Sequence, residues 1–219
     1  MTGRRNIVAV AGTNFLSACN PVFFCTLAAL WINLHYPFFE RQVLNVIFVS
    51  AVYTSPLLVT GFFAHYLNTR FSTRNVIVFS KAAEIVLALL GALTFWIPGR
   101  SCVGFMLAAA ALLGAEYSIY RPALKIYTAG KSSRLELSRN GAAVEAATFA
   151  GIVIGTVTAV LVFNLSELCH SRPGTGALLS VLIAMYSLML ASRLEVDLPA
   201  NSRVRFAELP RRWIDTLRL

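Results

Sequence analysis

Six ionisable side chains lie within otherwise apolar stretches of the sequence, and these are the residues that could do chemistry there. They are three cations and three carboxylates, namely Lys81, Arg121, Lys125, Glu84, Glu116 and Glu145. A charged side chain at the centre of a lipid bilayer costs about 2.5–3.5 kcal/mol even on a lenient insertion scale, so each should face the protein interior and pair or line a cavity. Their equal numbers predict that the charges balance.

The spacing of these residues predicts two local groups. Lys81 and Glu84 are three residues apart and can form an ion pair on one face of a helix. Arg121 and Lys125 are four residues apart and form a cationic edge that suits a phosphate, although Lys125 lies near a helix end from which its ammonium can reach water. Glu145 is either a structural partner of Arg121 or Lys125 or part of a binding site, and the two roles are compatible.

A stripe of neutral polar residues runs along the first apolar stretch. Asn14, Ser17 and Asn20 follow one another at a spacing of three. Such a stripe either bonds a neighbouring helix or lines a path through the membrane.

Prolines adjoin two of these polar positions. Pro21 follows Asn20, and Pro122 follows Arg121. A proline inside a helix removes a backbone hydrogen bond, so both positions predict a kinked or broken helix of the kind found at transport sites. The similarity of the two dipeptides is a weak trace of an internal repeat between the first and fourth apolar stretches.

The residues do not predict an enzyme, a metal site or a cofactor. His35, His65 and His170 are isolated in predicted loops, and no phosphate-binding glycine loop is present. The four cysteines have no metal-ligand spacing and are interpreted as small apolar side chains. A bridge between Cys102 and Cys169 on an oxidising outer face is the alternative.

The composition predicts an all-α membrane protein. Apolar residues make up 57% of the 219 positions and charged residues 13%, with a mean hydropathy of +0.68, whereas a soluble domain is about 45–50% apolar and about a quarter charged. Because lipid cannot satisfy backbone polar groups, each apolar stretch must be helical. The chain is expected to form a bundle over 1–193, one half of a typical secondary transporter, with six spans. They are predicted at 7–32, 44–64, 76–98, 102–127, 141–165 and 176–192.

The distribution of basic residues predicts the orientation. The net charge of +9 does not indicate nucleic-acid binding, because the basic residues are scattered in short loops rather than gathered in a stripe. Outside the spans, thirteen Lys and Arg residues fall on one side of the predicted membrane and three on the other. Cytoplasmic loops are enriched in these residues, so both termini are predicted to be cytoplasmic.

The C-terminal stretch is predicted to lie on the membrane surface. Residues 194–219 form a cytoplasmic linker that ends in an amphipathic segment, with Trp213, Ile214 and Leu217 on one helical face and charges on the other. This pattern is typical of an interfacial helix, and a disordered tail is the alternative.

Several of these segments together resemble the N-terminal half of the bacterial lysophospholipid transporters. These transporters belong to the major facilitator superfamily and are sometimes fused to a 2-acylglycerophosphoethanolamine acyltransferase. Residues 81–85 resemble the family's K-x-A-E-I segment, 114–125 its F-G-P-x-K segment, and 15–20 its first-helix motif. Residues 140–149, followed by Gly155 and Thr156, match best. The chain departs from the family pattern at Pro21 and Val22, where the family has an Asp-Asn pair.

This resemblance implies a function for the chain. It would move lysophosphatidylethanolamine-type lipids across the bacterial inner membrane for re-acylation, and its partners would be membrane lipids and a second transporter half or an acyltransferase. The cations would meet the phosphate, and the carboxylates would meet an amine or balance charge. The implied substrate-binding residues are Arg121, Lys125, Lys81, Glu84, Glu116, Glu145, Asn140, Asn20 and Asn14. The chain would be a fragment, a degenerate remnant, or a unit that pairs with another half.

Two other functions remain open at this point. A different major-facilitator porter, exporting drugs or metabolites by proton exchange, would use Glu116 and Glu145 as proton carriers. A non-transporting membrane scaffold would instead use the GxxxG motif at Gly151 and Gly155, together with the tail, as partner surfaces.

Overall fold

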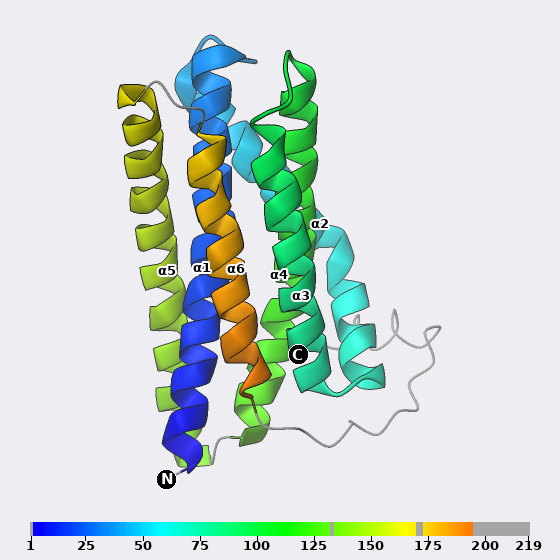
Figure 1. Cartoon of the computed structure of the whole chain (residues 1–219). Helices are drawn as coiled ribbons and strands as arrows, with labels where there is room; N and C mark the ends of the chain where they lie inside the picture. The colour runs from blue at the N-terminus through cyan, green and yellow to red at the C-terminus, as the bar shows by residue number, and fades with distance from the viewer. Residues whose placement is uncertain (1, 132–133, 170–172, 195–219) are drawn as a thin grey trace.

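The computed structural model describes residues 2–131, 134–169 and 173–194, and every element in these ranges is an α-helix (Figure 1). The helices form a single elongated bundle, in which α2 runs obliquely behind the others (Figure 1). They are α1 (Thr2–His35), α2 (Gln42–Arg70), α3 (Thr73–Thr94), α4 (Ser101–Lys131), α5 (Arg134–Leu168) and α6 (Gly174–Ser192).

Six helices of the described chain are long and apolar enough to cross a membrane, which confirms the predicted number of spans. This number of apolar helices is that of a multi-pass membrane protein. Most helices extend beyond the predicted spans, because polar residues at their ends continue the helix into the interface after the apolar stretch has ended. The third span is the exception at its C-terminal end. It ends at Thr94 rather than at 98, since Pro98 and Gly99, which has a φ of 75°, form a turn there.

The helices pack in a symmetric pattern. The main contacts of α1 are with α5 and α6, those of α4 are with α2 and α3, and α3 also packs on α6. Exchanging the first three helices with the last three maps the α1–α5 pair onto α4–α2 and the α1–α6 pair onto α4–α3. The bundle is thus arranged as two related sets of three helices, which the sequence indicated only weakly.

Glycines allow the closest of these helix contacts. A Cβ atom at Gly151 of α5 would overlap the backbone carbonyl oxygen of Phe15 on α1, and one at Gly155 would approach that of Cys19 equally closely. Gly114 of α4 has the same relation to Tyr53 of α2. The GxxxG motif therefore acts in helix packing within the chain, as such motifs do in membrane proteins.

The prolines do not break the helices, so the break expected at Pro122 is absent, and the kink predicted at Pro21 stays a prediction. Helix α1 continues through Pro21, α2 through Pro56 and α4 through Pro122. A proline removes one hydrogen bond, whereas ending the helix would free several backbone groups that lipid cannot satisfy. The helix is therefore retained.

The C-terminal segment and the cysteines are the subject of two further predictions. The predicted interfacial helix in 211–219 lies outside the described residues. All four cysteines are free thiols, so Cys102 and Cys169 are not bridged. Cys19 and Cys102 are buried in the bundle, in keeping with their interpretation as small apolar side chains, while Cys169 is exposed.

Candidate functional site

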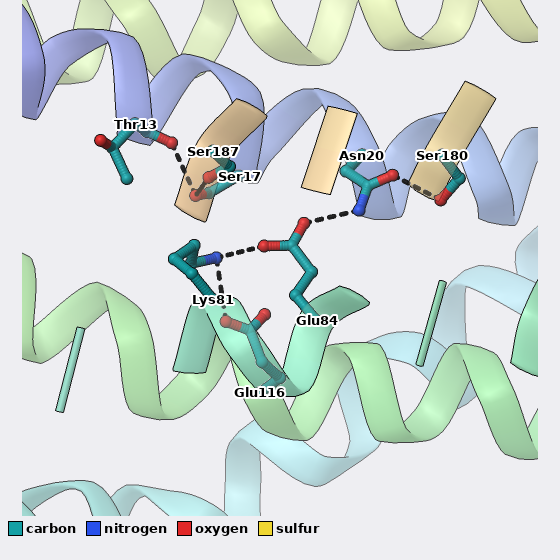
Figure 2. Close-up of polar contacts among 8 residues, drawn as sticks. All are labelled: Thr13, Ser17, Asn20, Lys81, Glu84, Glu116, Ser180 and Ser187. Atoms are coloured by element: carbon teal, nitrogen blue, oxygen red, sulfur yellow. Dashed lines mark hydrogen bonds and ion pairs between the residues drawn. The ribbon is translucent and has the colours of Figure 1, made fainter. Parts of the chain in front are cut away.

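One group of charged side chains is enclosed by the bundle. The Lys81 ammonium lies 2.5 Å from Glu84 Oε2, within α3, and 2.9 Å from Glu116 Oε1 on α4 (Figure 2). The three side chains are at most 5% exposed. We call these three residues the buried triad. The predicted pairing of Lys81 with Glu84 is confirmed, and Glu116 joins it from the neighbouring helix.

The periodicity of α3 explains why the triad is inside. Ile77, Lys81, Glu84 and Ala88 recur at spacings of four, three and four residues, so they share one helical face, and all four are fully buried. The charged pair therefore lies in the middle of a face that is otherwise apolar. Only the contacts made there compensate the cost of removing these charges from water.

Neutral groups from two more helices complete the surroundings of the triad. Asn20 of α1 donates a hydrogen bond from Nδ2 to Glu84 Oε1 at 2.6 Å, and Ser180 of α6 donates to Asn20 Oδ1 at 2.5 Å (Figure 2). The ring of Tyr120 on α4 lies 3.9 Å from the Lys81 ammonium, a distance suited to a cation–π interaction. One connected polar network therefore joins α1, α3, α4 and α6.

The remainder of the polar stripe on α1 bonds neighbouring helices rather than lining a path. Asn14 donates to the carbonyl oxygen of Val144 and to the hydroxyl of Thr148, both on α5, at 2.8 and 2.6 Å. The hydroxyl of Ser17 lies 3.4 Å from that of Ser187 on α6. Asn14 and Ser17 are therefore structural residues in the packing of α1.

A second group of charged side chains is accessible. Glu145 of α5 lies 3.0 Å from Arg121 Nη2 and 3.2 Å from Lys125 Nζ, both on α4. The side chains of Arg121, Lys125 and Glu145 are 40%, 62% and 38% exposed. We call these three residues the open triad. It links α4 to α5, which otherwise make few contacts.

The open triad borders a hollow of about 310 Å³ between α1, α2, α4 and α5. Arg121 and Glu145 lie in its wall together with the hydroxyl-bearing residues Tyr53, Tyr117 and Thr148. The remaining wall is apolar and is formed by Ala18, Val22, Phe149 and Ile152. The hollow therefore combines two opposite charges, hydroxyl groups and an apolar surface, the features that a ligand with a charged head and an apolar tail requires.

The two triads differ in formal charge. With every group ionised, the buried triad carries one ammonium and two carboxylates, and the open triad carries two cations and one carboxylate. The predicted balance of three against three holds for the two triads taken together but not within either triad.

The structure divides the predicted site residues into two sets. Arg121, Lys125 and Glu145 come together in the open triad, of which Arg121 and Glu145 line the hollow and Lys125 is paired with Glu145. Lys81, predicted to join them at a phosphate, is instead enclosed with Glu84, because α3 directs both side chains into the bundle. The other predicted residues, which are Glu116, Asn14, Asn20 and Asn140, are also buried. We therefore assign to the hollow only the three residues of the open triad.

Sequence reasoning missed several residues that surround the triads. Tyr120 and Ser180 contact the buried triad or its network, and Tyr53 and Tyr117 line the hollow. Tyrosines are common in apolar spans, so their types alone do not single them out. A signal for Ser180 is its place in a series of buried small residues on α6, which are Ala177, Ser180, Ala184, Ser187 and Ala191.

No protein-family model matches the chain, and no curated protein is significantly similar to it.

Proposed function

We propose that the chain forms the N-terminal half of a secondary transporter of the major-facilitator type, and that its hollow binds the headgroup of a lysophospholipid. The arrangement of the six helices as two related sets of three supports the first part, since transporters of this class are built from such repeats. The resemblance of 81–85 and 140–149 to lysophospholipid transporters supports the second.

The observation that carries the proposal is the open triad at the edge of the hollow. Phosphoethanolamine has one anionic phosphate and one cationic amine. Arg121 and Lys125 suit the phosphate, and Glu145 suits the amine, as guanidinium and carboxylate groups do in charge-assisted hydrogen bonds. The single acyl chain would lie along Val22, Phe149 and Ile152 or in the adjoining lipid.

The exposure of the open triad suits a ligand that must come and go. Ion pairs that are this accessible contribute about 0–1 kcal/mol to stability. Exchanging the contacts of Glu145 with Arg121 and Lys125 for contacts with a headgroup therefore costs little. The buried triad, in contrast, could not open without exposing charges to an apolar interior.

The proposal includes a setting in the cell. The side of the bundle with the thirteen basic residues faces the cytoplasm of a bacterium, both termini are on that side, and the membrane is the inner membrane. A second transporter half, encoded separately or in the same reading frame, would complete the alternating-access unit. An acyltransferase is the enzyme that would use the delivered lipid.

Replacing Arg121 with Lys tests the headgroup assignment. Lysine keeps the charge but loses the bidentate geometry that suits phosphate, so Arg121→Lys should weaken lysophosphatidylethanolamine binding about ten- to a hundred-fold, equivalent to about 1.5–3 kcal/mol. Binding is measured with purified protein in nanodiscs, with any second half supplied. Arg100→Lys, an exposed residue before α4, is the matched control and should bind like the parent.

A second ligand separates headgroup binding from general attraction to lipid. Monoacylglycerol has the acyl chain but no phosphate, so the parent and Arg121→Lys should bind it equally. Equal binding of lysophosphatidylethanolamine by the two proteins would show that Arg121 is a structural residue and would remove the site from the proposal.

A further inference from the structure

We infer that Glu116 is a proton-binding site inside the membrane and that it carries a proton in the resting protein at neutral pH. The inference rests on the composition of the buried triad, on the hydrogen bonds that its two carboxylates make, and on what surrounds Glu116.

Among the residues that the structure describes, Lys81 is the one cation within ion-pair distance of the two carboxylates of the buried triad. The other titratable side chains near Glu116 are the phenols of Tyr53 on α2 and of Tyr117 and Tyr120 on α4, and phenols are neutral at pH 7. Helix α1 contributes the neutral Asn20, and α6 contains no charged residue. With both carboxylates ionised, the triad would therefore carry one uncompensated negative charge.

The surroundings of Glu116 make such a charge expensive. The side chain is 5% exposed, and it borders a hollow of about 420 Å³ between α2, α3 and α4. Leu67, Phe71, Val76 and Phe79 line that hollow, so its surface is almost entirely apolar. A carboxylate without a compensating cation in such surroundings becomes protonated, because the free energy of burying its charge exceeds the free energy of binding a proton.

The hydrogen bonds assign the proton to Glu116 rather than to Glu84. Both oxygens of Glu84 accept hydrogen bonds, one from Lys81 and one from Asn20, and such bonds stabilise the ionised form. Among the described residues Glu116 makes one such contact, between its Oε1 and the Lys81 ammonium at 2.9 Å, whereas Glu84 makes two. Protonation of Glu116 therefore sacrifices fewer stabilising contacts than protonation of Glu84 would.

A proton at this position has a consequence for transport, and this step rests on the proposed function. Release of the proton would add a negative charge to the network that joins α1, α3, α4 and α6. The packing of these helices would then depend on occupancy of the site, as the coupling ion of a transporter requires. The binding of the proton does not itself depend on the identity of the transported substrate.

Infrared spectroscopy of the purified parent protein at neutral pH, without added lysolipid, tests the inference. The parent should show the stretching band of a protonated carboxyl group, and Glu116→Gln should lack it. Glu116→Gln should also fold as well as the parent, since the amide resembles the protonated acid in shape and charge. Glu145→Gln is the control, because Glu145 is an accessible carboxylate paired with two cations, and it should keep the band.

A second variant keeps the test decisive if Glu116→Gln does not fold. Glu116→Asp retains the carboxyl group in a changed position, so the band should shift in frequency. An absent band in the parent, a band that persists in Glu116→Gln, or an unshifted band in Glu116→Asp would overturn the inference. The measurement uses no lysolipid, so the absence of a proton on Glu116 would not affect the assignment of the headgroup site. Conversely, a lack of lysolipid binding at Arg121 would not affect the proton assigned to Glu116.

Discussion

Lys81 is the residue on which the buried network depends. Its ammonium faces the carboxylates of two different helices and the ring of Tyr120, and the side chain is fully buried. Removing one partner from a buried ion pair costs about 3–5 kcal/mol when the remaining charge is left uncompensated. The two members of the Lys81–Glu84 pair are not equivalent, however, because Glu116 remains to pair with Lys81 when Glu84 is lost.

Lys81→Met should therefore destabilise the protein more than Glu84→Gln. The first change leaves the Glu84 carboxylate without a cation, whereas after the second Glu116 can release its proton and pair with Lys81. We expect Lys81→Met to cost on the order of 3 kcal/mol, measured by thermal or denaturant unfolding in detergent. Lys125→Met, at the 62% exposed Lys125, is the control and should change stability little. Equal stabilities of Lys81→Met and Lys125→Met would refute the importance of the buried triad.

Contacts within one helix could be predicted from residue spacing. Between helices, opposite charge predicted the pairing of Glu145 with Arg121 or Lys125, but the partners of the buried pair could not be predicted. The spacing of Lys81 and Glu84 predicts their pairing because helix geometry alone brings residues three apart together. Glu116 and Tyr120 reach Lys81 only through the packing of α4 on α3, to which spacing gives no access. For the same reason the sequence placed Lys81 at the phosphate, whereas the structure encloses it.

At the scale of the helices, small residues decide which surfaces meet. The buried face of α6 consists of alanines, serines and a glycine at spacings of three and four residues, and Gly114, Gly151 and Gly155 allow the closest backbone approaches. In lipid, apolar side chains have little preference for protein over the bilayer, so tight packing of small residues provides much of the association. The existence and number of the helices follow from hydropathy. Their pairing depends on this fit, which hydropathy does not report.

Gly114→Ala should separate α2 from α4. The added Cβ would overlap the backbone carbonyl of Tyr53, which cannot rotate away as a side chain could, and such overpacking costs about 1–3 kcal/mol. Gly104→Ala, on the same helix with no atom within 4 Å of the added Cβ, is the matched control. It should be neutral or stabilise the protein by about 0.5–1 kcal/mol, because alanine favours a helix. Unfolding measurements that rank the two variants equally would contradict the close approach.

For the whole molecule, each helix runs the length of the bundle, so successive connections lie at alternate ends (Figure 1). The α2–α3 connection lies at the same end as the start of α1, and the α1–α2 and α3–α4 connections lie at the opposite end (Figure 1). The sequence predicted this alternation and, from the basic residues, the side that faces the cytoplasm. It indicated the two-by-three arrangement only weakly, since that is a property of contacts between distant helices.

Cysteine labelling in intact cells checks the proposed orientation. In a Cys169→Ser background, which removes the exposed native thiol, a cysteine at the exposed position 70 should react only with a membrane-permeant reagent. A cysteine at the exposed position 100 should react with an impermeant reagent added from outside. The reverse pattern would show that the protein has the opposite orientation in the membrane. Reaction of both positions from outside would show that the third helix does not cross the membrane.

The most direct test of the central claim is to locate the lipid. A lysophosphatidylethanolamine with a photoreactive group near its headgroup is activated in nanodiscs that contain the protein, and the modified residues are identified by mass spectrometry. The account predicts adducts at the hollow of the open triad, at Tyr53, Tyr117 and Phe149, competed by unlabelled lysolipid and reduced in Arg121→Lys. Adducts confined to the apolar hollow at Leu67 and Phe79, or spread evenly over the lipid-facing helices without competition, would contradict it.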